Sequence, residues 1–173
     1  MRGRVYIPIH QDGVLVGWQG RLVEHPDPPP GDDPRYFTMA GLRKSQLLYN
    51  QDTARRPPLV VVCEGCADVW GVGPAGVALL GKTPSLEQLR LLATLWRGRP
   101  AVVLLDPDAE ADARDLAERL RPLFPGRLVL ALLPEGLDPG ACPRRPLWDL
   151  LRSRAADHRV ELPLSDALLG RAR

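Results

Sequence analysis

The chain has 173 residues, 45% of them hydrophobic, which suits one domain, or one domain with a small appendage. It contains no run of 18 uninterrupted apolar residues and does not start with the apolar region of a signal peptide, so we expect a cytoplasmic protein without a membrane span. The net charge of +2 does not by itself indicate a nucleic-acid-binding protein. Arginine supplies nearly all the cations, which suits phosphate contacts, although a GC-rich genome produces the same bias and is the favoured explanation.

The amino-terminal part is predicted to be rich in strands. Residues 4–24 alternate apolar and other side chains on either side of Asp12-Gly13, a dipeptide typical of hairpin turns. Residues 25–34 are rich in proline and acid, which predicts a loop or linker. Residues 35–50 are expected to be irregular or partly helical.

From residue 59 onward, short apolar runs alternate with helical patterns. Ser85 and Gln88 form a capping box at the start of one helix. Strands are predicted at 59–62, 77–80, 101–105 and 128–133, with helices after Ser85, at 109–121 and at 146–155. Strands that alternate with helices indicate an α/β fold with a mainly parallel sheet and helices on both faces. Ligands bind such sheets at the carboxyl ends of the strands.

The three cysteines do not indicate a disulfide framework, because their number is odd and no secretion signal is present. Cys63 and Cys66 form a CxxC motif, but a zinc site needs two more ligands at suitable spacing. Only Cys142 and three scattered histidines are available. We therefore expect no zinc.

Acidic residues follow two of the predicted buried strands. Glu64 comes after the first, and Asp106 and Asp108 come after the strand at 101–105. A carboxylate beside a buried strand is destabilising unless it is paired or binds a cation. Oxygen ligands alone select hard ions, so the pattern predicts a Mg²⁺ or Mn²⁺ site. The alternative interpretation is that these are loop acids and helix caps, with Asp108 as the N-cap of the 109–121 helix.

The runs VVVCEGCADVW, VALLGKTPSLEQLRLL and AVVLLDPDAEADA resemble the TOPRIM domain of DnaG-type primases, topoisomerases and some nucleases. That domain carries Glu-Gly after one strand and Asp-x-Asp after a later one, and Glu64-Gly65 and Asp106-Pro107-Asp108 fit this signature. The primase branch is the most similar. The stretches ADV and LPEGLDP resemble primase segments, and this resemblance places Asp68 and Asp138 on further acids near the metals.

The resemblance extends upstream and covers roughly residues 4–155. RVYIPIHQDGVLVGWQGR, PRYF and RKSQLLYN resemble successive blocks of the primase core. They place Arg21, Arg35 and Lys44 on basic positions that line the primase cleft. Lys82, where the family usually has Thr, is a further candidate for phosphate binding. Without the resemblance, these cations would be interpreted as solvated surface charges.

Several positions depart from the primase pattern. Pro107 replaces a glycine between the two aspartates, and Glu110-Ala111 replaces Ala-Gly after them. Gly140 replaces an acid, and Thr38 replaces an asparagine. These changes resemble phage or mobile-element versions of the domain, and they leave the reaction rate and the number of bound metals open.

The resemblance implies a small basic, strand-rich subdomain at 1–50, a TOPRIM domain at 51–156 and a tail at 157–173. The implied activity is metal-dependent nucleotidyl transfer that makes RNA primers from NTPs on a single-stranded DNA template. A separate zinc-binding or helicase protein is an expected partner, because regions with those roles are absent from these residues. The rival hypotheses are a metal-dependent nuclease and a non-catalytic module of a split primase that binds nucleic acid or a partner.

Overall fold

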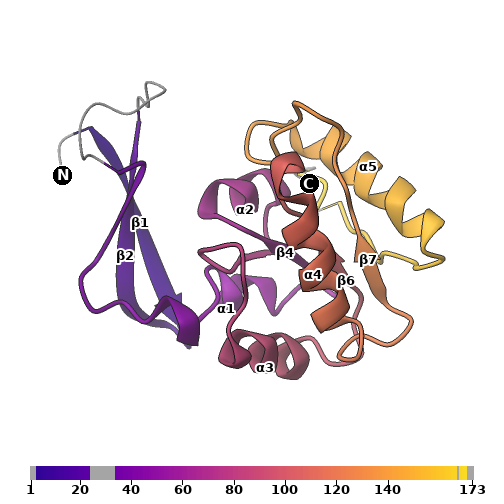
Figure 1. Cartoon of the computed structure of the whole chain (residues 1–173), viewed down its shortest axis with the longest axis horizontal. Helices are drawn as coiled ribbons and strands as arrows, with labels where there is room; N and C mark the ends of the chain where they lie inside the picture. Colours follow the sequence, from indigo (N-terminus) through magenta and orange to yellow (C-terminus); the bar gives the residue numbers. More distant parts are fainter. Residues whose placement is uncertain (1–2, 24–33, 167, 171–173) are drawn as a thin grey trace. The chain divides into compact units, whose positions relative to one another are not determined.

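A computed structural model describes residues 3–23, 34–166 and 168–170. The chain divides into two compact units, a smaller one at Met1–Arg43 and a larger one at Lys44–Arg173 (Figure 1). Each is considered by itself below.

The smaller unit is a three-stranded antiparallel sheet in the order β1-β2-β3. Its strands are β1 (Arg4–Gln11), β2 (Val14–Leu22) and β3 (Tyr36–Thr38). Asp12 and Gly13 both have positive φ, 53° and 79°, which confirms the predicted hairpin turn. β3 lies in the segment that was expected to be irregular or partly helical. That expectation is wrong for these three residues, because pairing with β2 makes them a strand. Most of the loop predicted at 25–34 lies outside the described residues.

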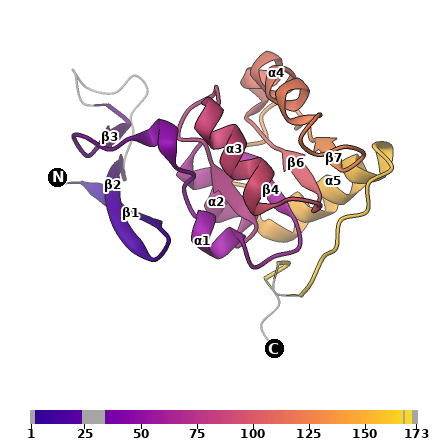
Figure 2. The ribbon, with the colours of Figure 1, turned by 90° about the horizontal axis from the view of Figure 1, so that it is seen from below.

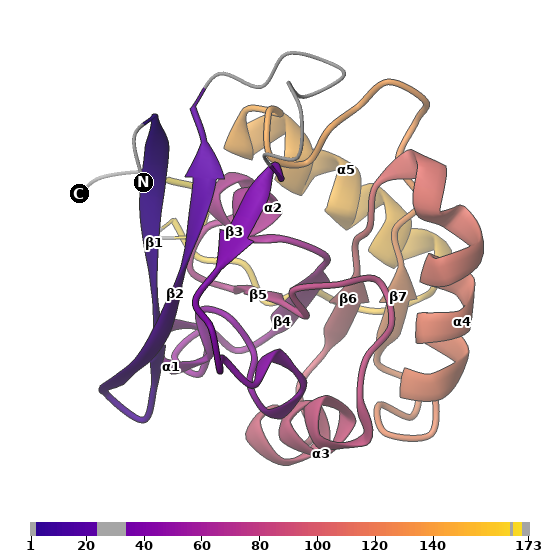
Figure 3. The ribbon, with the colours of Figure 1, turned by 60° about the vertical axis from the view of Figure 1, so that its left-hand side comes forward.

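The larger unit contains a four-stranded parallel sheet in the order β5-β4-β6-β7 (Figure 3). Its strands are β4 (Val60–Cys63), β5 (Gly76–Ala78), β6 (Ala101–Val103) and β7 (Leu128–Leu130). All four residues of β4 are buried, as expected for a central strand that is covered on both faces. The four predicted strands are therefore confirmed, each shifted or shortened by a few residues.

Helices cover both faces of this sheet, with α3 and α4 on one side and α2 and α5 on the other (Figure 2). The helices are α1 (Gln51–Ala54), α2 (Cys66–Val72), α3 (Leu86–Leu95), α4 (Glu110–Leu120) and α5 (Arg144–Asp157), with 3-10 turns at Lys44–Gln46 and Pro107–Ala109. This arrangement confirms the predicted α/β fold with a preceding strand-rich part. Within the described ranges, no helix is long and apolar enough to span a membrane.

The predicted capping box at the start of α3 is present and fixes the loop that follows β5. The Gln88 N–H donates to Ser85 Oγ at 3.1 Å, and the Ser85 N–H donates to Gln88 Oε1 at 3.0 Å. The buried Gln88 amide also donates to the carbonyls of Leu79 and Leu47. The segment between β5 and α3, which carries Lys82, is thereby held at both of its ends.

Candidate metal centre

The order of the strands brings three acidic loops to one edge of the sheet. β4 and β6 are parallel neighbours, with Val62 opposite Val103, so the residues that follow them leave the sheet side by side. β7 lies on the other side of β6, and its continuation leads to Asp138. The carboxylates predicted at separate strand ends therefore come from adjacent strands.

Asp68 is held at this edge by the turn that joins β4 to α2. The Gly65 N–H donates to Asp68 Oδ2 at 2.8 Å, so the carboxylate reaches back to the start of its own helix. Asp68 is only 7% exposed. A buried acid with one backbone donor keeps further lone pairs available for a cation or another donor.

Asp138 is positioned by close packing of its loop on α2. The Gly140 N–H donates to Asp138 Oδ1 at 2.7 Å. Gly71 allows the approach, because a Cβ built on it would lie 2.1 Å from the Pro139 carbonyl oxygen. The loop after β7 therefore rests against α2, the helix that also carries Asp68.

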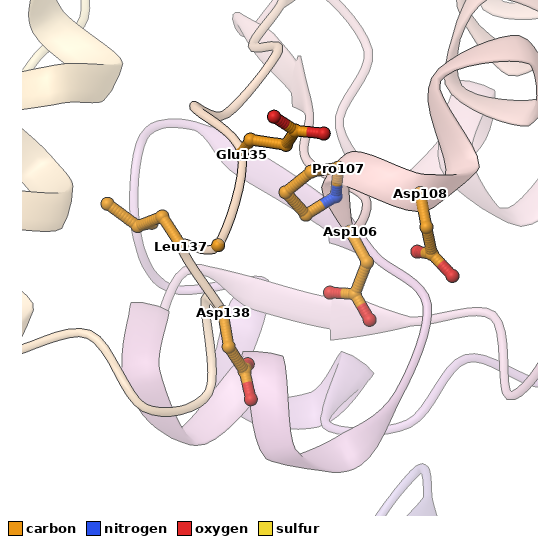
Figure 4. A pocket seen from close by; sticks show the side chains of 7 residues that line it. Asp106, Pro107, Asp108, Glu135, Leu137 and Asp138 are labelled. Carbon is orange, nitrogen blue, oxygen red and sulfur yellow. The ribbon is translucent and has the colours of Figure 1, made fainter.

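Asp68, Asp106 and Asp138 form the group of acids that the described residues bring together most closely. One carboxylate oxygen from each lies within 4.8 Å of those of the other two. Asp106 and Asp138 also line a cavity of about 420 Å³, together with Pro107, Asp108, Glu135, Gly136 and Leu137 (Figure 4). Only carboxylate oxygens meet here, and this donor set fits a hard divalent ion such as Mg²⁺ or Mn²⁺.

The acids repel one another in the absence of a cation. Burial raises the pKa of Asp68 to about 6, with the Gly65 hydrogen bond opposing the rise and the charges of Asp106, Asp138 and Glu64 adding to it. Burial also raises the pKa of Glu64, and the positive charge of Lys82 offsets part of that rise. A cation at this edge would relieve the repulsion.

The residues first expected to hold the metal are Glu64, Asp106 and Asp108. Both aspartates influence the pKa of Glu64, so the three share one electrostatic environment. Asp108 lies in the 3-10 turn Pro107–Ala109 and is exposed. The structure places Ala109 at the N-cap of α4, so the alternative interpretation of Asp108 as that helix's cap is wrong.

Glu135 lines the same cavity, but the sequence did not single it out. It stands three residues before Asp138 in the same loop, and that proximity was the available signal. Glu135 adds a sixth carboxylate to the five candidate acids, and it comes from the loop that follows β7.

The predicted phosphate-binding residues are distributed over both units. Arg21 belongs to the smaller unit, where its guanidinium lies 5.6 Å from the centre of the Tyr36 ring. Arg35 is exposed in the same unit. Lys44 and Lys82 are exposed in the larger unit, and Lys82 is the cation that lowers the pKa of Glu64.

The sequence matches no protein-family model and no curated protein. Solved structures of primases do share the fold. A DNA primase domain from Pseudomonas aeruginosa is similar with a TM-score of 0.65 and 27% identity, over 90% of this chain and 51% of that chain. The RNA polymerase domain of Mycobacterium tuberculosis primase DnaG has a TM-score of 0.69 and 24% identity, over 86% and 54%. A DnaG primase catalytic domain bound to single-stranded DNA has a TM-score of 0.68 and 24% identity, over 90% and 51%.

The chain therefore has the fold of part of a DnaG primase catalytic core. It spans about half the length of these primase structures.

Proposed function

We propose that this chain is the metal-binding TOPRIM part of a DnaG-type primase core, which makes RNA primers on single-stranded DNA. The observation that carries the proposal is the convergence of acids from three adjacent strand ends on the edge where α/β sheets bind ligands. The likeness to primase cores supports the same reaction class. The departures at Pro107 and Gly140 are consistent with a phage or mobile-element version.

Glu64, Asp106 and Asp108 would hold the metal, with Asp68 and Asp138 supporting them. A bound Mg²⁺ or Mn²⁺ would neutralise phosphate charge and lower the pKa of the attacking 3′-hydroxyl. The protein's own part is to fix these carboxylates before the substrate arrives. Two backbone donors do so: the Gly65 N–H holds Asp68, and the Gly140 N–H holds Asp138. No covalent intermediate on a side chain is needed for attack on the α-phosphate of an NTP.

Cations of the chain would bind the phosphates that the acids themselves repel. We call the end of the sheet where Glu64, Asp68, Asp106, Asp108 and Asp138 meet the acidic edge. Lys82 is near enough to Glu64 to lower its pKa, so it can meet a triphosphate that approaches the acidic edge. Arg21, Arg35 and Lys44 would contact triphosphate or template backbone. One of the similar primase domains is described as bound to single-stranded DNA, which supports a template of that kind.

Metal binding is tested by calorimetry with Mn²⁺ on the full chain. We expect binding to the wild type and a loss of at least tenfold in affinity for Asp106→Ala. Asp149→Ala, which removes an exposed acid on α5, is the matched control and should bind as the wild type does. Equal Mn²⁺ affinity in Asp106→Ala and in the wild type would show that this metal site does not exist.

The reaction is tested by adding labelled NTPs and labelled single strands together with Mn²⁺. Entry of NTP label into oligomers supports primer synthesis, and Glu64→Ala and Asp108→Ala should abolish it. A second protein that holds the template should raise the yield, because positioning contributes roughly 7–11 kcal/mol to such reactions. Shortened strands without incorporation would instead identify a nuclease. If neither product forms but the chain binds nucleic acid or a partner protein tightly, the chain is a non-catalytic module.

A further inference from the structure

Three aromatic side chains lie next to one another on the three-stranded sheet of the smaller unit. The strands β1, β2 and β3 lie side by side (Figure 3). Tyr6 is on β1, Trp18 is on β2 and Phe37 is on β3, so each strand contributes one ring. The ring centres of Tyr6 and Trp18 are 5.8 Å apart, and those of Trp18 and Phe37 are 6.0 Å apart. We call these three residues the aromatic row.

The strand register explains why the rings share one face. Tyr6 pairs with Gly20, and Gly20 pairs with Phe37, so these two rings flank a position that has no side chain. Trp18 lies two residues before Gly20 and therefore points to the same side. Alternation places Ile7 on the opposite side, where it is fully buried.

The aromatic row thus occupies the face that an antiparallel sheet usually gives to polar residues. Tyr6 and Phe37 are each 48% exposed. The planes of Trp18 and Phe37 differ by 25°, and those of Tyr6 and Trp18 by 37°, so the rings have similar orientations. The ring centres are too far apart for the rings to cover one another face to face, so part of each ring face stays accessible to a ligand. Two half-exposed rings beside a third form an apolar patch, and apolar patches on a protein surface are places where a partner can bind.

An arginine lies beside the aromatic row. The Leu22 N–H donates to the Arg35 carbonyl, which continues the pairing of β2 beyond β3. By alternation, Arg35 then falls on the same side as Phe37, at one end of the aromatic row.

We propose that the aromatic row is a stacking platform for the bases of single-stranded nucleic acid, with Arg35 binding the phosphate backbone beside it. Flat rings accept every base through its π-face, whereas a row of aliphatic side chains would not. The inference rests on the proposed function, because it assigns a template-binding surface to the same nucleic-acid substrate.

The test measures binding of a fluorescent oligo(dT) strand to the full chain by anisotropy, in EDTA so that the metal centre does not contribute. Trp18→Leu and Phe37→Leu keep apolar volume but remove a ring, and each should weaken binding roughly 5- to 150-fold. Trp18→Phe and Phe37→Tyr keep a ring and should bind nearly as the wild type does. Trp70→Leu removes a ring of similar exposure, 42%, from the larger unit and should have no effect.

Salt dependence separates stacking from charge. A neutral ring releases no counterions, so the leucine variants should keep the wild-type dependence of log Kd on log salt. Arg35→Ala should reduce that slope by about 0.7. Photo-crosslinking of a 5-iodouracil strand to the wild-type chain, which needs no variant to fold, should label peptides that contain Tyr6, Trp18 or Phe37.

Wild-type affinity in both leucine variants would overturn the proposal, as would crosslinks confined to other peptides. A wild-type dimer that the leucine variants convert to monomers, with DNA affinity unchanged, would show that another protein copy covers this face instead. In each of these cases Mn²⁺ binding and NTP incorporation remain independent measurements, so the proposed function is tested separately.

Discussion

The raised pKa of Asp68 makes its replacement by asparagine informative. An asparagine amide oxygen can still accept the hydrogen bond that the Gly65 N–H gives to Asp68 Oδ2 at 2.8 Å. Asp68→Asn therefore removes the buried charge but keeps the contact that orders the start of α2. The variant isolates the electrostatic contribution of this acid to stability.

The magnitude follows from the protonation equilibrium. The pKa of Asp68 rises from an ordinary 3.8 to about 6, and at 1.36 kcal/mol for each pKa unit this corresponds to about 3 kcal/mol. The folded state holds the proton more tightly than the unfolded state between these two values. The free energy of unfolding therefore decreases as pH rises from about 4 to about 6, and the full destabilisation is present above that range.

Urea unfolding in EDTA measures this effect. Asp68→Asn should be more stable than the wild type at pH 7.5 by up to about 3 kcal/mol, and the two should converge near pH 4. In a second series without EDTA, Mn²⁺ at 100 times its Kd for the wild type should stabilise the wild type by about 2.7 kcal/mol and the variant by less. A constant difference between the two proteins from pH 4 to pH 7.5 would refute the reasoning, because a lost contact, unlike a titrating charge, is independent of pH.

Three further predictions concern packing, capping and charge. Gly71→Ala should destabilise the fold by about 1–3 kcal/mol in thermal unfolding and weaken Mn²⁺ binding in calorimetry. Gly81→Ala is the control, because its added Cβ meets nothing within 4 Å, and it should change neither stability nor Mn²⁺ binding. Ser85→Ala removes the acceptor for the Gln88 N–H and should lower the free energy of unfolding by about 1 kcal/mol, whereas Ser85→Thr should retain most of it. Lys44→Ala should reduce the salt slope of single-strand binding by about 0.7, and an unchanged slope would show that Lys44 is an ordinary surface charge.

Local patterns were sufficient to predict the four strands and the helices α3, α4 and α5 of the larger unit, whereas the short helices α1 and α2 were not predicted. Each buried strand is a short apolar run, and the capping box of α3 is a local signal that the structure reproduces. β3 could not be predicted in this way, because three residues carry too little periodicity and the strand depends on pairing with β2 across the intervening loop.

The acidic edge was predictable only in part. Glu64, Asp106 and Asp108 could be selected from the sequence, because each follows a buried strand directly. Asp68 and Asp138 were reached through the family resemblance, and nothing local showed that they would join Asp106 within 4.8 Å. Their proximity depends on tertiary packing, which no pattern within one element encodes.

The distribution of charge within the acidic edge indicates where a divalent ion would relieve the most repulsion between carboxylates. Glu64 already has a cationic neighbour, because Lys82 lowers its pKa against the effect of burial. Asp68 has no comparable cation among the influences on its pKa, which are burial, a backbone donor and other carboxylates. A divalent ion near Asp68, Asp106 and Asp138 would therefore relieve more repulsion than one near Glu64. We accordingly expect a metal held by Asp106 to lie toward the supporting acids Asp68 and Asp138, with Lys82 supplying part of the positive charge on the Glu64 side.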